Sequence, residues 1–240
     1  MTQLSPAAPA ALAPPTVAAL TGRRAGQPVL GVKRRLWRKD DDHALVADKA
    51  FAPVREQVLK RDNYSCRFCG FRSPKFQEVH HWDDDHANNE LGNLMTVCNL
   101  CHQVHHLGMC GMRGAGFIAA LPELTQTEVN HIARAHFVAQ LLVDTNTKDR
   151  LTGLYALLRA RADMLKSAFQ LDIASPLLFA EILSGCDERM YAVRASFLES
   201  LRLVATEAAF QPGQLEYYAT NQRTQFAPDQ WLALAAQLLR

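Results

Sequence analysis

Two Cys-x-x-Cys pairs constrain this chain more than any other feature. Cys66 and Cys69 form the first pair, and Cys98 and Cys101 form the second, with residues 70–97 between them. Two intervening residues let both thiolates reach one ion from a tight turn, and two such turns complete the tetrahedral four-sulfur shell of a structural zinc site. The alternative is four unrelated buried cysteines, because free cysteine is commonly buried. The doubled spacing favours zinc.

Composition limits the size of the fold and the cellular compartment that this sequence fits. It has 240 residues, 48% hydrophobic and 21% charged, enough to bury a core in one large domain or two small ones. No apolar run approaches the roughly 20 residues of a membrane helix, and the N-terminus lacks the basic start of a secretory signal. We therefore expect a cytoplasmic protein without membrane insertion, in which cysteines bind metal rather than form disulfides. Cys110 and Cys186 have no partner pattern and are interpreted as ordinary small apolar residues.

Histidines gather in and after the segment between the two pairs. Residues 79–81 predict the end of a strand, and residues 98–106 predict a turn that opens a helix. His102 and His106 are four residues apart on that helix, so both rings point to the same side. Two helix histidines and one from the strand would make a three-ligand site with an open position, as a catalytic divalent metal needs. Spacing alone leaves open whether His105 takes the place of His106.

The order of these residues resembles the HNH (ββα-metal) nuclease motif, in the version whose frame holds a four-cysteine zinc. The resemblance covers about residues 58–107. It implies that His81 is the general base that deprotonates the attacking water and that His80 is a metal ligand. It also implies that Asn93 braces the loop by hydrogen bonds and that the two helix histidines are the remaining metal ligands.

Phosphodiester hydrolysis suits these residue types. A neutral imidazole, with an ordinary pKa of about 6.5, can accept the proton of the attacking water. A second divalent cation, such as Mg²⁺, Mn²⁺, Ni²⁺ or Zn²⁺, would neutralise the phosphoryl oxygens. The alternative is that the histidines are surface or turn residues beside a purely structural zinc. His80 and His81 should point to opposite faces of a strand, so reaching one site would require a local bend or strain.

An acidic loop follows the proposed base. Asp83, Asp84 and Asp85 either form a solvated turn, which we favour, or supply a carboxylate that supports a metal or orients a histidine.

The net charge of +2 conceals an uneven distribution. Residues 22–80 contain 14 Lys and Arg against 7 Asp and Glu, whereas the rest of the chain is mildly acidic. Basic residues near a phosphodiester-cutting site would attract a nucleic-acid backbone, so we expect DNA binding with little sequence specificity. The alternatives are a solvated arm or an acidic partner protein. The candidate nucleic-acid contacts are Lys33, Arg34, Arg35, Lys60, Arg61 and Arg67.

Periodicity and capping signals predict the remaining elements. We expect helices over 53–62, from a capping box at Thr125 onward, over 148–170, from Ser175-Pro176 to Gly185, after Asp187 through Leu201, and from Pro228 to the end. The segment 117–121 predicts a short strand, and the glycines of 108–116 predict a flexible or tightly turned segment.

Further segments resemble the IcmJ/DotN family of type IVB secretion and conjugation systems, over about residues 29–205. The segments that carry it are Gly31–Arg35, Lys60–Phe71, Asn88-Asn89, Asn93-Leu94 and Leu121–Gln126. The resemblance implies a cytoplasmic component of the coupling complex, peripheral to the inner membrane, that binds a coupling ATPase and helps recruit substrates. In that family the HNH-like core can be a zinc-stabilised scaffold without activity. This chain keeps the full histidine set, so enzyme and adaptor both remain open.

Together these patterns predict an α+β protein, with a small ββα-metal (HNH, treble-clef-like) zinc module followed by an all-helical C-terminal region. We expect a disordered Ala/Pro-rich arm over 1–28, the zinc module with its basic N-terminal segment over 29–120, and a helical partner-binding region over 121–240.

Overall fold

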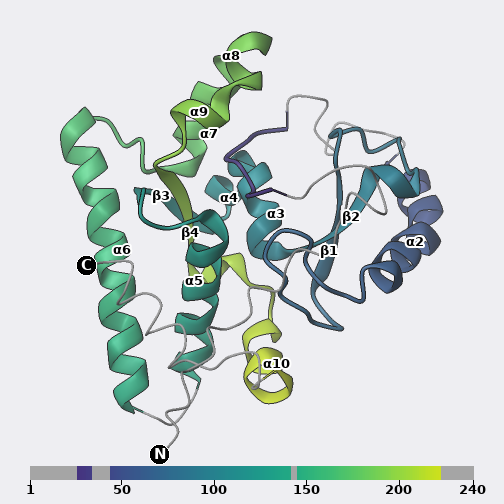
Figure 1. Ribbon diagram of the computed structural model, residues 1–240, viewed down its shortest axis with the longest axis horizontal. Coiled ribbons are helices and arrows are strands. Elements are labelled where there is room, and N and C mark those ends of the chain that lie inside the picture. Colours follow the sequence, from purple (N-terminus) through teal and green to yellow (C-terminus); the bar gives the residue numbers. More distant parts are fainter. Residues whose placement is uncertain (1–25, 34–43, 142–144, 223–240) are drawn as a thin grey trace, which may run out of the picture.

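The computed structural model describes residues 26–33, 44–141 and 145–222, and it places two small sheets side by side between the helices at the outer edges of the molecule (Figure 1). Most of the expected arm, the basic residues Arg34 and Arg35, and the final helix expected from Pro228 lie outside the described residues.

The first sheet is the hairpin of β1 (Gln77–His81) and β2 (Leu94–Cys98), paired antiparallel so that Gln77 faces Cys98 and His81 faces Leu94. Helix α2 (Ala44–Arg61) packs on it through a small core of Val58, Leu59, Val79 and Leu94. The short turn η2 (Leu91–Asn93) leads into β2, and α3 (Asn99–His105) follows directly from it. This ββα arrangement places the second cysteine pair where β2 becomes α3.

The second sheet joins β3 (Gly116–Ala120) to β4 (Leu201–Ala205), which are antiparallel with Gly116 opposite Ala205. Helices α5 (Gln126–Gln140) and α6 (Thr145–Phe169) cover it, and Figure 1 shows α6 at the edge of the molecule farthest from α2. The strand β3, which we assigned to the zinc module, therefore pairs with a strand from the C-terminal region.

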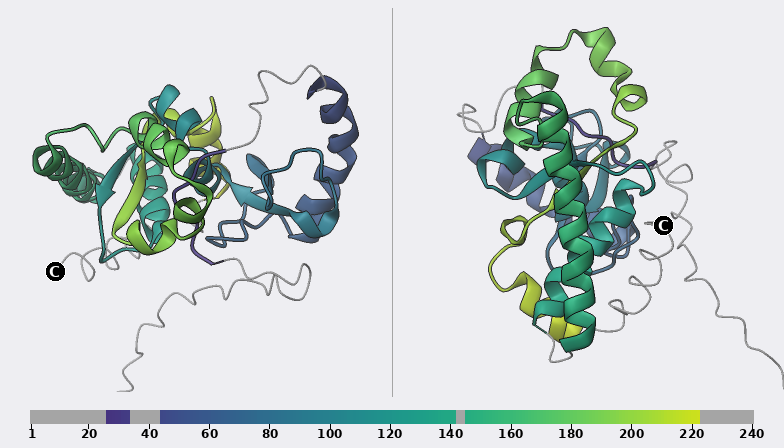
Figure 2. Two further views of the ribbon diagram at one scale, coloured as in Figure 1. Left: turned by 90° about the horizontal axis from the view of Figure 1, so that it is seen from above. Right: turned by 90° about the vertical axis from the view of Figure 1, so that its left-hand side faces the viewer.

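The remaining described helices connect or flank these elements. They are α4 (Leu107–Met112), α7 (Pro176–Gly185), α8 (Glu188–Ala192), α9 (Arg194–Phe197) and α10 (Gln214–Asn221), with the short turn η3 (Glu207–Ala209). The largest hydrophobic core runs through both halves and includes Cys98, Val104, Phe137, Leu183 and Tyr218. Figure 2 shows the two halves from above, with the hairpin module on one side and the α6 side on the other.

The caps expected from the sequence are present. Thr125 accepts a hydrogen bond from the backbone NH of Glu128, whose carboxylate accepts from the backbone NH of Thr125, so the capping box at the start of α5 is confirmed. Ser175 caps α7, with Pro176 at its first position.

Three expectations about elements were wrong. Helix α2 begins at Ala44, so Pro53 lies inside it rather than at its start. The glycine-rich segment contains α4, and a Cβ at Gly111 would collide with the backbone of Leu177, so glycine there lets α4 and α7 pack closely. The single helix expected to run through Leu201 is instead two short helices, α8 and α9, that end at Phe197, and the apolar run of β4 pairs with the otherwise open edge of β3.

A short N-terminal segment is built into the core although it precedes the module. The backbone NH of Gly31 donates to the carbonyl of Val104, and Leu30 and Val32 are buried. The hydroxyl of Tyr191 bonds both backbone groups of Val32. The segment thus carries Lys33 to the side of α3 that bears the histidines.

Candidate metal centres

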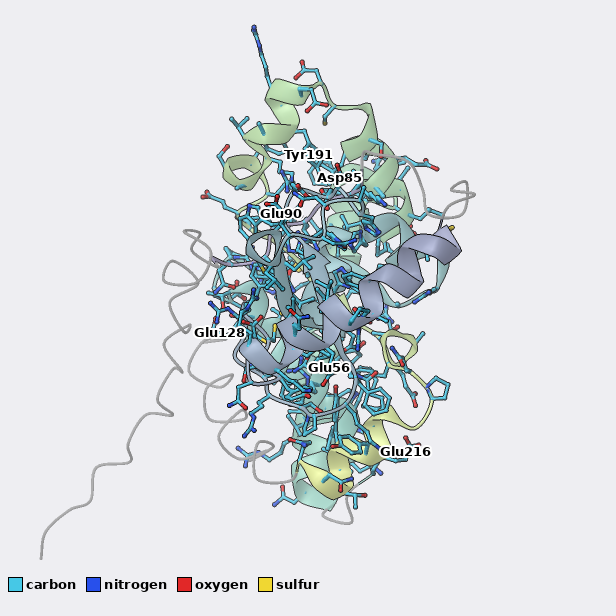
Figure 3. All side chains as sticks on the ribbon, turned by 90° about the vertical axis from the view of Figure 1, so that its right-hand side faces the viewer. Glu56, Asp85, Glu90, Glu128, Tyr191 and Glu216 are labelled. Carbon is cyan, nitrogen blue, oxygen red and sulfur yellow. The ribbon has the colours of Figure 1, made fainter. Side chains whose placement is uncertain are left out.

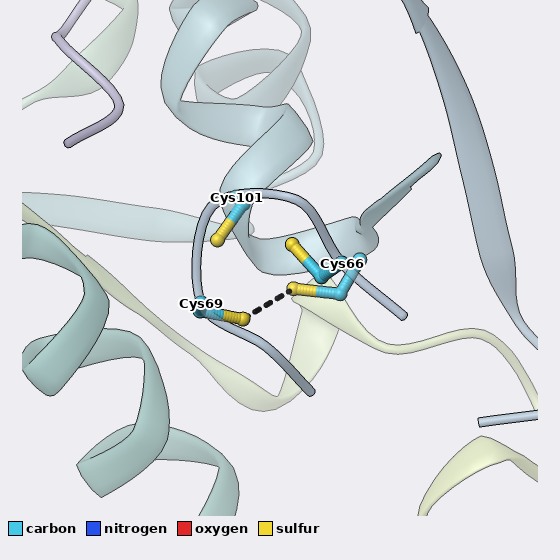
Figure 4. A group of neighbouring side chains, drawn as sticks. Cys66, Cys69 and Cys101 are labelled. Carbon is cyan, nitrogen blue, oxygen red and sulfur yellow. Dashed lines mark hydrogen bonds between the residues drawn. The ribbon is translucent and has the colours of Figure 1, made fainter. Parts of the chain in front are cut away.

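The four cysteines of the two pairs converge on one point (Figure 4). Their four Sγ atoms lie within 4.8 Å of one another, and the Sγ atoms of Cys69 and Cys98 are 3.6 Å apart. Zinc–sulfur bonds of about 2.3 Å in a tetrahedron imply sulfur–sulfur separations of about 3.8 Å. The geometry therefore fits a structural zinc ion.

Local structure explains how each pair reaches this point. The backbone NH of Cys66 donates to the carbonyl of Phe71, and Gly70, with a φ of 73°, closes the turn by donating to the carbonyl of Cys66. Cys98 ends β2, and Cys101 lies in the first turn of α3. The first pair thus comes from a tight turn and the second from a strand-to-helix junction.

Electrostatics also favours a cation in this cage. Cys66, Cys98 and Cys101 are at most 1% exposed. Burial raises the pKa of the Cys66 and Cys101 thiols well above their ordinary value. Four thiolates can be held together here only if a positive ion compensates their charge.

Sequence reasoning missed the helix that touches this cage from outside. Arg134 of α5 places its Nη2 3.0 Å from Cys98 Sγ, and Asn130 places its Nδ2 3.3 Å from Cys101 Sγ. The only indication in the sequence that this helix contacts a site was the four-residue spacing of its polar residues Asn130 and Arg134. That spacing does not show which element the helix faces.

Three histidines form a second cluster beside the first. One ring nitrogen from each of His80, His102 and His106 lies within 4.8 Å of the others, and the Nε2 atoms of His102 and His106 are 3.1 Å apart. His105 does not join them: its ring stacks between His80 and Phe68. The assignment of His106 as a ligand stays a prediction that this arrangement favours.

Glu78 orients this cluster, and we did not single it out from the sequence. Its Oε2 lies 2.7 Å from His102 Nδ1. A carboxylate accepts the Nδ1 proton, which leaves the lone pair of His102 on Nε2, toward His106 and His80. The sequence did contain an indication of this role. Glu78 lies two residues before His80, so strand alternation puts both side chains on the same face of β1.

Burial keeps these rings in the neutral form that binds metal. Burial, with a further contribution from neighbouring histidines, lowers the pKa of His80 well below its ordinary value. Burial lowers the pKa of His106 to about 2 and that of His105 to about 3. The rings of His80 and His106 are therefore uncharged at neutral pH.

His81 lies on the other face of β1, as strand alternation requires. Its Nε2 is 3.0 Å from Asn89 Oδ1, and its ring stacks on that of His86 at 4.8 Å between centroids. Because an amide oxygen can only accept, Nε2 carries the proton and the lone pair lies on Nδ1. We expected backbone strain where His80 and His81 adjoin. The residues with a left-handed backbone conformation are instead Phe76, just before β1, and Asp84, in the loop after it.

Asn93 holds the loop between the two strands. Its Nδ2 donates to Asp83 Oδ1 at 2.8 Å and to the carbonyl of Asn88 at 3.0 Å, while its Oδ1 accepts from the backbone NH of Asp83. Asp83 also accepts from Asp85 NH and Asn88. The acidic loop is therefore an ordered, internally bonded turn.

A pocket of about 660 Å³ opens beside the histidine cluster. His102 and His106 form part of its wall, opposite apolar side chains such as Met109 and Met112. Its basic lining residues are Lys33, Arg55 and Arg113. The histidine cluster is thus reachable from outside, unlike the buried cysteine cage.

The expected basic surface is smaller than the sequence suggested. Arg67 is 2% exposed and pairs with the buried Asp62 at 3.7 Å, so the expectation that it contacts nucleic acid was wrong. The guanidinium of Arg61 donates to Asp62 and to the carbonyls of Leu91 and Leu94, so its hydrogen bonds are used within the fold. Lys60 is exposed and pairs with Glu56 of α2 at 3.5 Å. Figure 3 labels Glu56 on that helix.

Fold and site together define a mixed α/β protein with two small antiparallel sheets, a largely helical C-terminal region and a closed four-cysteine centre. No family model matches the chain. A comparison with curated proteins finds 30% identity over 177 residues to the type 4 apparatus protein DotN of Legionella pneumophila, which covers 72% of this chain and 81% of DotN. The chain belongs to the IcmJ/DotN family. The resemblance to HNH nucleases stays a prediction.

No helix in the part of the chain that the structure describes is both long and apolar enough to span a bilayer.

Proposed function

We propose that this protein is a zinc-stabilised adaptor of a type IVB secretion or conjugation apparatus, located at the cytoplasmic side. The observation that carries this proposal is the similarity to DotN over most of both chains. The closed cysteine cage supports it, because a four-sulfur zinc site stabilises a fold and leaves no open coordination position for chemistry.

The C-terminal helices supply the surface for a partner, in keeping with the helical partner-binding region expected over 121–240. Leu157 and Met164 of α6 are 56% and 63% exposed, and their seven-residue spacing puts them on one face of the helix. Exposed apolar side chains grouped on one face mark an interaction surface. The partner that the family resemblance implies is the coupling ATPase.

Co-purification tests the adaptor role. The full chain should retain the apparatus components, including the coupling ATPase, and a Leu157→Ser, Met164→Ser double variant should lose them. Leu91→Ser is the matched control, because Leu91 is also exposed but lies in the zinc module. Retention of the partners by the double variant, or their loss in the control alone, would contradict the proposed surface.

The histidine cluster supports a second candidate function, metal-dependent hydrolysis of nucleic-acid phosphodiester bonds. The specific observation is the open set of His80, His102 and His106 beside a pocket with basic lining residues. In this reading the three rings would hold a divalent cation that neutralises charge on the phosphoryl oxygens. His81 would accept the proton of the attacking water through Nδ1, and Asn93 would hold the loop in place. With Arg67 buried, contacts to a DNA backbone would come from residues such as the half-buried Lys33 of the pocket lining and the exposed Lys60.

Plasmid cleavage tests this second candidate. Wild type and His81→Ala are compared with Mg²⁺, Mn²⁺, Ni²⁺ or Zn²⁺ added. Nicking by wild type that falls at least a hundredfold in His81→Ala supports the base assignment. If both proteins are equally active or equally inactive with every cation, the enzymatic reading fails, and partner binding by the inactive variant leaves the adaptor role standing.

A further inference from the structure

Helix α5 presents one polar stripe to the cysteine cage although most of the helix is buried. Gln126, Asn130 and Arg134 follow each other at four-residue spacing, and all three are at most 3% exposed. Arg134 Nη2 reaches Cys98 Sγ at 3.0 Å, and Asn130 Nδ2 reaches Cys101 Sγ at 3.3 Å. Both side chains donate to sulfur, which is what an anionic metal–thiolate centre requires of its surroundings.

The charge of Arg134 has its counterpart in the same cage. Four thiolates around a divalent cation carry a net charge of about −2, and a guanidinium remains charged in proteins. Arg134 is fully buried, and among the described residues no carboxylate forms an ion pair with it. An uncompensated buried charge is strongly destabilising. Each group therefore supplies the charge that the other needs.

The donor directions along α5 agree with this arrangement. Arg134 Nη1 lies 3.2 Å from His131 Nδ1 and can only donate, so Nδ1 accepts and the proton of the ring is on Nε2. His131 Nε2 then donates to the carbonyl of Cys69 at 2.9 Å. The guanidinium also lies over the ring of Phe71, 4.0 Å from its centroid. Arg134 thus touches both cysteine turns.

The same stripe continues into the second sheet. Gln126 Nε2 donates to Asn130 Oδ1 at 2.9 Å and to the carbonyl of Leu203 at 2.8 Å, and Gln126 Oε1 accepts from the NH of Leu203. A chain of hydrogen bonds therefore runs from Cys101 through Asn130 and Gln126 to β4.

We propose that α5 supplies the outer shell of the tetracysteine centre, with Arg134 as its buried counter-charge. Metal binding and the docking of the helical region onto the zinc module are then one cooperative event. Arg134 and Asn130 are positioning residues for the metal ligands, although they lie outside the module that holds the ion. This coupling does not depend on whether the protein acts as adaptor or nuclease.

Zinc release from the full chain tests the proposal. Transfer of zinc to a chromogenic chelator should be about ten- to a hundredfold faster in Arg134→Met and in Asn130→Leu than in wild type. Arg134→Lys, which keeps the charge, should fall between wild type and Arg134→Met. Ile132→Ala is the matched control, because Ile132 is a fully buried residue of α5 in the core away from the cysteines.

The control separates an outer-shell role from simple loss of packing. If Ile132→Ala accelerates zinc release as much as Arg134→Met, or if the Arg134 and Asn130 variants release zinc at the wild-type rate, the proposal is overturned. Alkylation of the zinc-bound thiolates gives an independent readout where a variant is poorly stable. Asn130→Leu should increase alkylation of Cys101, because a lost hydrogen bond to sulfur makes the thiolate more nucleophilic.

Hydrogen exchange tests the coupling from the other direction. Removal of zinc by a chelator should deprotect the amides of α5 together with those of residues 66–71 and 98–101. If α5 keeps its protection after the metal is removed, docking of the helix does not depend on the ion and the coupling is wrong.

Discussion

The cysteine cage and the histidine cluster share the stretch from Cys98 to His106, yet they differ in every property that separates a structural from a reactive metal site. The cage has four ligands, is buried and is covered by α5. The cluster has three histidines that could hold a metal ion, one of them bonded to Glu78, and it lies beside a pocket. One strand-to-helix junction thus builds a closed centre on one side and an open one on the other. A closed centre stabilises the fold, whereas an open centre can exchange its ion.

The largest expected effect comes from breaking the cage. Cys69→Ala should lose zinc and unfold the module, because structural zinc contributes on the order of 10 kcal/mol of folding free energy, comparable to the whole stability of a domain. Thermal melting by circular dichroism and zinc content by elemental analysis check this. Cys186→Ala is the control, since Cys186 lies outside the cage, at the end of α7, where its Sγ donates to the carbonyl of Ile182. A soluble Cys69→Ala protein with unchanged melting would contradict a structural zinc.

Removal of a histidine should separate the two centres. His80→Ala or His102→Ala should abolish binding of an exchangeable Mn²⁺ or Ni²⁺ ion while one zinc per chain and the melting temperature are largely kept. Isothermal titration with each cation, beside elemental analysis, measures both. His86→Ala is the control, because His86 lines the pocket but does not belong to the cluster. A single metal per wild-type chain in excess Mn²⁺, Ni²⁺ or Mg²⁺ would count against a second site.

A smaller change sharpens the role of Glu78. Glu78→Gln keeps the shape of the side chain but loses the charge that fixes His102, so affinity for the exchangeable cation should fall about ten- to a hundredfold. Zinc content should stay the same. Glu90→Gln, an exposed acid in the loop before β2, should leave both metals unchanged. Equal cation affinity in Glu78→Gln and wild type would show that the carboxylate does not orient the ligand.

A separate prediction concerns acid stability on the histidine side. Burial lowers the pKa of His105 to about 3, whereas the unfolded chain takes up this proton near pH 6.5. The unfolded state therefore binds more protons between these values, so stability is full above pH 6.5 and is lost as the pH falls toward 3. The loss is about 1.4 kcal/mol per pH unit. Urea unfolding at several pH values should show a shallower dependence in His105→Phe. Identical slopes would contradict the prediction.

Local patterns predicted the parts of the fold that are built from neighbouring residues. The Cys-x-x-Cys turns, the capping box of Thr125 and the Ser175-Pro176 start of α7 all depend on contacts a few residues apart. Such contacts are set by backbone geometry, which the residue type controls directly.

The missed features depend on pairing over long stretches of chain. Strand β4 pairs with β3 across more than 80 residues, and a short apolar run is compatible with a helix or a strand until its partner is known. Arg67 looked like a surface cation because its burial against Asp62 depends on how the first turn packs on β2.

The sequence by itself determined which residue types form the two clusters: four cysteines at Cys-x-x-Cys spacing, and histidines on one strand and one helix. Only the tertiary structure decided what surrounds them. It placed Arg134 and Asn130 on the thiolates, directed Glu78 to His102 and buried Arg67. The physical reason is that a ligand set follows from local spacing, whereas charge compensation and access to solvent depend on elements that meet only when the core forms.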